Sequence, residues 1–187
     1  MVFNRILIIG ATGLLGKPVV ERLTERGHPV RILTRSPAKA EALFGRSIEY
    51  AEGSATNIDD VRAAMAGCEA VHINLTPAAE YTATSHVIEV ADGSLGRLGY
   101  VSATTLSEEL RWFDRVDVKM RTEQLFRDSG LPYAIFCPPW VMETLQYFIR
   151  GGNWALSVDG KNPPQLHWFA AADFGRMVAE SYKDDRA

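Results

Sequence analysis

Features that mark several large protein classes are scarce in this sequence. Its 187 residues include two cysteines, too few for a disulfide framework and consistent with a reducing compartment. No apolar run approaches the roughly 18 residues of a membrane span, and the first residues show no signal-peptide cleavage pattern. The 20 Lys and Arg residues are outnumbered by 23 Asp and Glu and form no basic cluster. We therefore expect a cytoplasmic protein with no membrane or nucleic-acid partner.

Patterns for several kinds of catalysis are missing as well. The four histidines have no metal-ligand spacing, so no metal site is expected. The Gly-x-Ser-x-Gly motif of many hydrolases does not occur. Cys68 and Cys137 are expected to be packed thiols and not nucleophiles.

What is present is a regular alternation of short apolar runs with helix-length segments. The run Arg5–Ile9 has the length and composition of a parallel strand buried on both faces. Further strands are predicted at Val30–Thr34, Ile48–Ala51, Ala70–Asn74, Gly99–Ser102 and Tyr133–Phe136, with helices at Leu14–Arg26, Ala38–Phe44, Ile58–Met65, Ala78–Ala91, Asp117–Ser129 and Asp173–Tyr182. This order predicts right-handed crossovers and a Rossmann-type, doubly wound α/β sheet of about six or seven parallel strands.

The last part of the chain has a different character. Pro138-Pro139, Gly151-Gly152 and Pro163-Pro164 divide it into short pieces, with a further strand expected at Leu166–Phe169. No linker separates a second domain. We predict a single domain over residues 1–187, in which residues 141–169 form a small lobe on the substrate side.

The strongest motif is a glycine loop placed between the first strand and the first helix. Gly10, Gly13 and Gly16 are spaced Gly-x-x-Gly-x-x-Gly. At such a turn the free backbone N–H groups and the helix dipole favour a pyrophosphate. Gly10 suits the tight turn, Gly13 lets a phosphate approach the backbone, and Gly16 allows close helix–strand packing. An ordinary glycine-rich turn is the alternative, but the position in the fold favours a dinucleotide.

The end of the second strand indicates which dinucleotide is bound. Proteins that bind NAD place a carboxylate there for the ribose 2′-hydroxyl, whereas this chain has Arg35, with Ser36 and Lys39 nearby. The guanidinium is suited to a phosphate. We therefore predict that NADP(H) is preferred over NAD(H); the alternative is that both cations are merely solvated.

Three stretches together resemble the NmrA-like branch of the atypical short-chain dehydrogenase/reductases. They are Ile8–Gly16, Leu33–Arg35, and the run from Ser129 through Tyr133 to the Pro-x-Trp-x-Met-Glu segment Pro138–Glu143. The resemblance covers essentially the whole chain. It implies a Rossmann fold, NAD(P)(H) binding, and either reduction of a small carbonyl or quinone or sensing of the nucleotide's redox state. The pair Gly53-Ser54 departs from it, because many relatives have Gly-Asp there and use the Asp to bind adenine.

The resemblance also implies a set of cofactor-binding residues. The pyrophosphate would be held by Gly10, Thr12, Gly13, Leu14, Leu15 and Gly16, and the 2′-phosphate by Arg35. Asn74, Leu75 and Thr76 would lie along the adenosine and inner ribose, Lys119 would bind the nicotinamide ribose, and Pro138 and Val141 would flank the nicotinamide.

The expected catalytic machinery is incomplete. Related reductases use Tyr-x-x-x-Lys, in which the Lys lowers the pKa of a Tyr acid one helical turn away. Lys119 is present here, but position 115 is Arg, which cannot act as that acid. Ser102 stands where many relatives have a substrate-binding Ser or Thr. Lys119 and Ser102 are the candidate catalytic residues; a solvated lysine and a structural strand end are the alternatives.

These observations favour an NADP(H)-dependent oxidoreductase that reduces a small quinone or carbonyl compound. A quinone needs little help from a protein acid, and Trp112 and Phe113 could stack on a planar acceptor or simply anchor their loop. A non-catalytic NADP(H) sensor is the alternative from another class, and a sugar-nucleotide epimerase is a weaker one. A small-molecule substrate is the expected partner, and a homodimer is left open.

Overall fold

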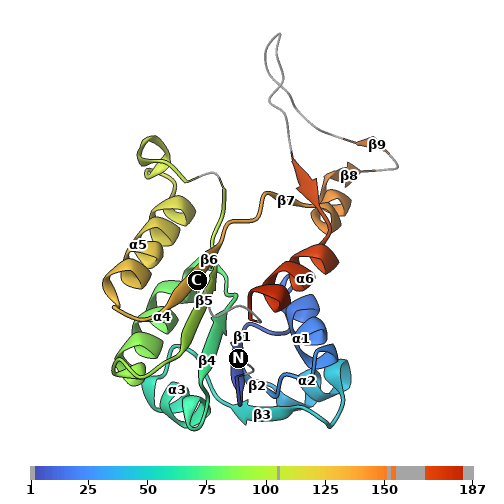
Figure 1. Ribbon diagram of the computed structural model, residues 1–187. Coiled ribbons are helices and arrows are strands. Elements are labelled where there is room, and N and C mark those ends of the chain that lie inside the picture. The colour runs from blue at the N-terminus through green and yellow to red at the C-terminus, as the bar shows by residue number, and fades with distance from the viewer. Residues whose placement is uncertain (1–2, 105, 151–152, 155–166, 183–187) are drawn as a thin grey trace.

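A parallel sheet forms the centre of the computed structural model, which describes residues 3–104, 106–150, 153–154 and 167–182 (Figure 1). Its strands are β1 (Ile6–Ile9), β2 (Val30–Thr34), β3 (Glu49–Glu52), β4 (Ala70–Ile73), β5 (Arg97–Val101) and β6 (Tyr133–Phe136). They lie in the order β3-β2-β1-β4-β5-β6, and every neighbouring pair is parallel. The strand order therefore changes direction between β1 and β4, which confirms the doubly wound Rossmann-type sheet.

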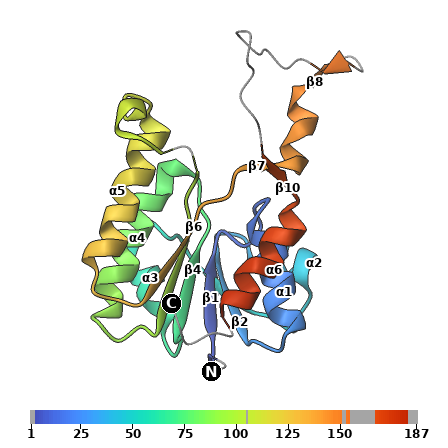
Figure 2. The same cartoon turned by 45° about the horizontal axis from the view of Figure 1, so that its top comes forward.

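Helices cover both faces of this sheet. The first face carries α1 (Gly16–Glu25), α2 (Pro37–Phe44) and α6 (Ala171–Ser181), and the other carries α3 (Ile58–Met65), α4 (Pro77–Ala91) and α5 (Asp114–Asp128), as Figure 2 shows. The helix α6, at the far end of the chain, packs beside α1. Such a three-layer arrangement buries both faces of the strands and leaves their ends to form a site.

The first strand shows why its residues are all apolar. Ile6 and Ile8 pack in the core under α1 and α6, whereas Leu7 and Ile9 pack in the core under α3 and α4. Successive side chains of a strand point to opposite faces, so a central strand needs apolar residues at every position.

Five of the six helix starts differ from the prediction by one to three residues, and two of these differences have a clear physical reason. The first helix begins at Gly16 and not at Leu14, because residues 10–15 form the loop itself. The helix α5 begins at Asp114, three residues before the predicted start at Asp117. Acidic side chains in a first turn interact favourably with the helix dipole, and Asp114 and Asp117 both lie in that turn.

The segment after β6 begins over the α6 side of the sheet. Its first strand, β7 (Trp140–Val141), pairs in parallel with β10 (Trp168–Phe169). The 3-10 helix η2 (Met142–Phe148) follows, and then β8 (Ile149–Arg150) pairs antiparallel with β9 (Asn153–Trp154). Both carboxylate oxygens of Glu143 accept from the backbone N–H of Ala171, at 3.0 and 3.1 Å, and so tie η2 to the start of α6.

The predicted lobe at residues 141–169 is thus described only in part. Residues 155–166, including the expected start of the last strand at Leu166, lie outside the described residues. Among the helices of the described part, none is long and apolar enough to cross a lipid bilayer.

Candidate functional site

The glycine loop after β1 is tightly packed at two of its glycines and open at the third. Gly10 has φ +87°, and a Cβ there would lie 1.8 Å from the carbonyl oxygen of Asn74. A Cβ at Gly16 would lie 2.1 Å from the carbonyl oxygen of Gly10. At Gly13 the nearest atom would be 3.4 Å away, at ordinary contact distance. The structure therefore needs glycine at positions 10 and 16, while the space beside Gly13 is free for a ligand.

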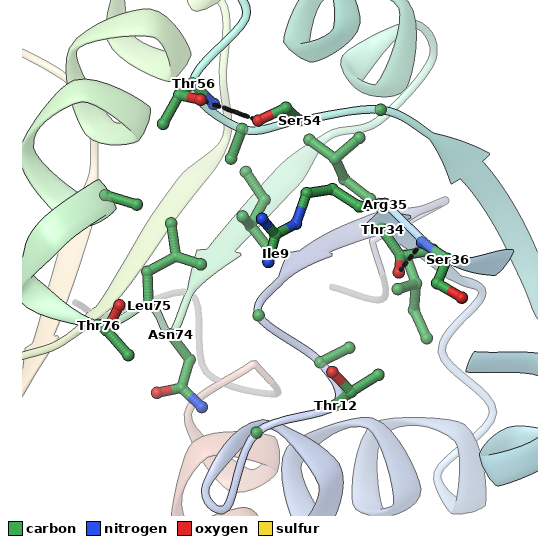
Figure 3. Close-up of a pocket in the computed structure, with 18 of the residues that line it drawn as sticks. Ile9, Thr12, Thr34, Arg35, Ser36, Ser54, Thr56, Asn74, Leu75 and Thr76 are labelled. Carbon is green, nitrogen blue, oxygen red and sulfur yellow. Dashed lines mark hydrogen bonds between the residues drawn. The ribbon is translucent and has the colours of Figure 1, made fainter. Parts of the chain in front are cut away.

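A cavity of about 580 Å³ lies at this loop, along the carboxyl ends of the first strands. Seven of the predicted cofactor-binding residues line it: Gly10, Thr12, Gly13, Arg35, Asn74, Leu75 and Thr76. Figure 3 shows Asn74, Leu75 and Thr76 on one side of this space and Thr12 below it. The sheet brings these segments together because the carboxyl ends of β1, β2 and β4 share one edge.

The charge in this cavity is positive. Arg35 extends from the end of β2 into the space, as Figure 3 shows, and Lys39 of α2 is also among the lining residues. No Asp or Glu is among the described residues that line the cavity. In the described part of the chain neither cation forms an ion pair with a carboxylate, although many other Arg residues do, such as Arg46 with Glu41. Two cations that line one cavity and form no ion pair among the described residues are suited to a phosphate group.

The loop between β3 and α3 closes the upper side of the cavity in Figure 3 with hydroxyl groups. The Oγ of Ser54 lies 2.8 Å from Oγ1 of Thr56. Asp60 accepts a hydrogen bond from the Ser54 backbone N–H at 2.8 Å, and a Cβ at Gly53 would lie 2.7 Å from the Asp60 Cβ. At Gly53-Ser54 the sequence departs from the Gly-Asp pair of many members of the family that it resembles. This wall of the cavity therefore has serine and threonine side chains where those proteins have a carboxylate.

Three other predicted pyrophosphate residues have different positions. Leu14 is exposed, Leu15 packs against the core under α1, and Gly16 is buried at the start of that helix. None of the three lines the cavity. Leu15 therefore contributes packing, and Gly16 allows the helix to approach the loop closely.

The two candidate catalytic residues lie beyond the cavity, at the carboxyl end of β5. Lys119 donates to the Glu80 carboxylate at 3.1 Å, to the Val101 carbonyl at 3.1 Å and to the Tyr100 hydroxyl at 3.4 Å. It does not have the surroundings of a solvated surface lysine, since only 16% of its side chain is exposed. Burial raises the pKa of Glu80, and the charge of Lys119 opposes this shift.

Ser102 is also held by a carboxylate. Its hydroxyl donates to Oε1 of Glu123 at 2.5 Å, and Arg127 donates to the other oxygen of that carboxylate at 2.6 Å. The serine is buried, and its backbone N–H donates to the Phe136 carbonyl. The hydroxyl of Ser102 has a single proton, and this proton is directed at Glu123. Towards any other group the hydroxyl can therefore only accept a hydrogen bond.

The position of the missing tyrosine is exposed. Arg115 lies on the surface of α5, one turn before Lys119. Tyr100 is fully buried, and burial raises its pKa above the ordinary value. A buried phenol of raised pKa is a poor proton donor to a substrate. Pro138 and Val141 lie between β6 and η2, partly exposed and outside the cavity wall.

Glu80, Glu123 and the pair Ser54–Thr56 were not predicted as site residues. The signal for Glu80 was available, because it has the spacing of Ala83, Thr84 and Val87 on the buried face of α4. No comparable pattern identifies Glu123, since its contact with Ser102 joins α5 to the end of β5.

Comparisons with known proteins indicate nucleotide binding. A family model described as NAD(P)H-binding matches residues 10–182. The chain is 31% identical over 134 residues to a (4-alkanoyl-5-oxo-2,5-dihydrofuran-3-yl)methyl phosphate reductase of Streptomyces griseus, covering 71% of this chain and 46% of that protein. This chain thus spans less than half the length of that relative.

Solved structures share the fold at lower identity. An NADPH-dependent quinone oxidoreductase of Escherichia coli, solved with NADPH, superposes with a TM-score of 0.75 at 22% identity over 96% of this chain and 65% of that one. An anaerobillin reductase of Escherichia coli O157:H7 superposes with a TM-score of 0.72 at 21% identity, over 94% of this chain and 89% of that one. Because the family model spans every strand of the central sheet except β1, the chain belongs to the NAD(P)H-binding family of Rossmann-fold proteins.

Proposed function

We propose that this protein uses NADPH to reduce a small acceptor, with a quinone favoured over a simple carbonyl compound. One observation carries the proposal: the cavity at the glycine loop has two cations, Arg35 and Lys39, that form no ion pair within the described part of the chain, and no carboxylate is among its described lining residues. A 2′-phosphate matches this charge, whereas a bare ribose would lack its usual acceptor. The quinone oxidoreductase and the reductases among the relatives support the choice of reaction.

The residues present fit a dinucleotide phosphate. The free space beside Gly13 and the N-terminus of α1 suit the pyrophosphate, and Arg35 with Lys39 suits the 2′-phosphate. Asn74, Leu75 and Thr76 follow directly after β4 and line the side of the cavity nearest to β4 and β5. When bound, the reduced nicotinamide supplies a hydride. Pro138, Val141 and Lys119 are the residues proposed to surround that end.

The preference for a quinone as the hydride acceptor follows from the lack of a suitable proton donor. Neither Arg115 nor Tyr100 can deliver a proton to a carbonyl oxygen, the first because of its basicity and the second because it is buried. A simple ketone that accepts hydride becomes a strongly basic alkoxide and needs a positioned donor. A quinone becomes an anion stabilised by an aromatic ring and can take its proton from water.

A second candidate function is a redox sensor that binds NADP(H) without catalysis. The exposed Arg115 at the position of the acid favours it. A sensor is expected to bind NADP+ and NADPH with different affinities, or to change its protease sensitivity between them, while reducing no acceptor.

One experiment separates these functions. Oxidation of NADPH is followed by absorbance with a panel of quinones, aldehydes and ketones, beside calorimetry with NADPH, NADP+ and NADH. We expect NADPH to bind more tightly than NADH, quinones to be reduced, and simple aldehydes not to be. Efficient reduction of a plain aldehyde would contradict both functions. Absence of turnover with unequal binding of NADP+ and NADPH would favour the sensor.

Three finer assignments belong to the same proposal. We infer membership of the NmrA-like branch from the Pro-x-Trp-x-Met-Glu segment at Pro138–Glu143, a cytoplasmic location, and a homodimer as the assembly to test by light scattering. Subcellular fractionation of cells that produce the protein tests its location.

A further inference from the structure

A buried ion pair lies where α4, α5 and the end of β5 meet. Glu80 has no exposed surface, and its Oε2 lies 3.1 Å from Nζ of Lys119. Its other oxygen, Oε1, has no hydrogen-bond partner among the described residues. An ammonium has three N–H donors, and here Glu80, Val101 and Tyr100 accept from them. Lys119 is therefore held in one place by acceptors on two elements.

Stability alone is a weak reason for such a pair. Apolar groups form much of the surroundings: Tyr100 stacks on Phe126 with ring centroids 5.0 Å apart, and Val87 belongs to the same core. Replacing a buried ion pair by well-packed apolar residues is often neutral or stabilising. A buried charge pair in this core therefore points to a role beyond holding two helices together.

The position of the pair indicates that role. Ala78 and Ala79 of α4 line the cavity, and Glu80 is the next residue. Val101 is the last residue of β5, at the carboxyl edge of the sheet. In doubly wound sheets a dinucleotide lies across the point where the strand order reverses, with one half over each set of strands. The pair thus sits beside the half of the site that the described cavity does not reach.

We propose that Glu80 is a positioning residue for Lys119. This inference rests on the proposed function, in which the nicotinamide half of NADPH lies over β4 and β5. The Glu80 carboxylate holds the ammonium beside the Val101 carbonyl, and a ribose hydroxyl replaces Tyr100, the most distant of the three acceptors. Glu80 itself touches neither cofactor nor substrate.

The first test measures Lys119 without any cofactor. Reductive methylation modifies only the neutral amine, and its rate at Lys119 is followed by peptide mass spectrometry at pH 7.5. Glu80→Gln removes the opposite charge from a buried ammonium, so we expect labelling to become about tenfold faster. Glu49→Gln is the matched control, because it removes a carboxylate from the buried Arg31 at the other end of the sheet. An unchanged rate in Glu80→Gln would overturn the proposal.

The second test measures NADPH affinity between pH 7 and pH 9. In Glu80→Gln the affinity is expected to fall about tenfold more than in the wild type over this range, because the ammonium is lost more readily. A pair that only joined α4 to α5 would lower stability and leave this pH profile unchanged, which would also overturn the proposal.

A double-mutant cycle covers the case in which Glu80→Gln does not fold. The variant with Glu80→Met and Lys119→Met replaces the whole pair by apolar side chains and is expected to fold. If Glu80 acts only through Lys119, this variant binds NADPH as weakly as Lys119→Met alone. A further loss beyond Lys119→Met would overturn the proposal. Failure of the proposed function would give a different result, because the wild-type protein would then not bind NADPH. The labelling rate of Lys119 would still show whether Glu80 affects that amine.

Discussion

A methyl group placed on Gly10 would lie 1.8 Å from the carbonyl oxygen of Asn74, a distance that no pair of atoms tolerates. The two residues follow β1 and β4, the strands between which the sheet order reverses. Their close approach brings the glycine loop against the end of β4 and so forms one end of the cavity. Substitutions in the loop are therefore expected to act in two distinct ways.

Gly10→Ala should damage the fold, and Gly13→Val should damage only the site. At Gly10 the clash adds to a φ of +87°, so we expect a loss of more than about 2 kcal/mol of unfolding free energy. At Gly13 a branched side chain enters free space and blocks the pyrophosphate, so stability stays within about 1 kcal/mol while NADPH binding is lost. Urea unfolding and calorimetry on both variants test this. A stable Gly13→Val protein that still binds NADPH would mean that the nucleotide binds elsewhere.

Arg35→Ala should weaken NADPH binding without changing NADH binding. Hydrogen bonds to a charged group contribute about 1.5–3 kcal/mol, and only NADPH has the 2′-phosphate that Arg35 would contact. The control is Arg46→Ala, because Arg46 lies past the end of α2 and pairs with Glu41 at the surface. Calorimetry with both nucleotides measures the difference. Equal losses for NADPH and NADH would rule out the 2′-phosphate assignment.

Stability should fall in mild acid because of His72. This side chain is fully buried between the sheet and α6 beside Phe136 and Tyr182, and burial lowers its pKa from 6.5 to about 3. Between these values the unfolded chain binds a proton that the folded protein does not. The stabilisation from the neutral imidazole is therefore complete above pH 6.5 and is lost by up to about 1.4 kcal/mol per pH unit as the pH falls towards 3.

Urea unfolding between pH 4.5 and pH 7 measures this slope. His72→Leu should flatten it, and it should cost little at neutral pH, since neither imidazole nitrogen has a partner in the described structure. His86→Leu is the control and should keep the wild-type slope, because His86 is only partly buried. An identical slope in His72→Leu would show that other groups carry the acid sensitivity.

Arg31→Met should lower stability without touching the site. Arg31 donates to the carbonyls of Ala64 and Ala66 at 2.7 and 2.6 Å, near the end of α3, and it pairs with Glu49 at 2.6 Å. Its loss removes the donor from the Ala66 carbonyl and leaves the Ala64 carbonyl only the Cys68 thiol, so we expect about 2–3 kcal/mol less unfolding free energy and unchanged NADPH affinity. Arg62→Met, which removes an exposed ion pair with Asp59, should change stability by less than about 1 kcal/mol. Thermal and urea unfolding compare the two variants.

Local patterns were sufficient to predict the sheet and the glycine loop. The apolar residues Ile6–Ile9 form a strand buried on both faces, and Gly10 and Gly16 leave no room for any larger side chain. The direction change between β1 and β4 follows from the alternation of strands and helices, because right-handed crossovers leave few arrangements. Arg35 could likewise be placed from its position after a predicted strand, since the end of such a strand lies at the ligand edge.

The partners of the candidate catalytic residues could not be read in the same way. Lys119 and Glu80 are 39 residues apart, and Ser102 and Glu123 are 21 apart, so no periodicity relates them. The sequence predicted a strand at Leu166–Phe169, but no local pattern identifies Trp140–Val141 as the strand with which β10 pairs.

By itself the sequence determined the fold class, the glycine loop and the cationic residue beside it, because each depends on spacings within one strand–turn–helix unit. Only the tertiary structure decided that Lys119 is buried against Glu80, that Ser102 directs its proton at Glu123, and that His72 lies in the core. These contacts arise where helices pack on the sheet, and the free energy of a buried charge or polar group depends on all the elements around it. That environment exists only once the layers have come together.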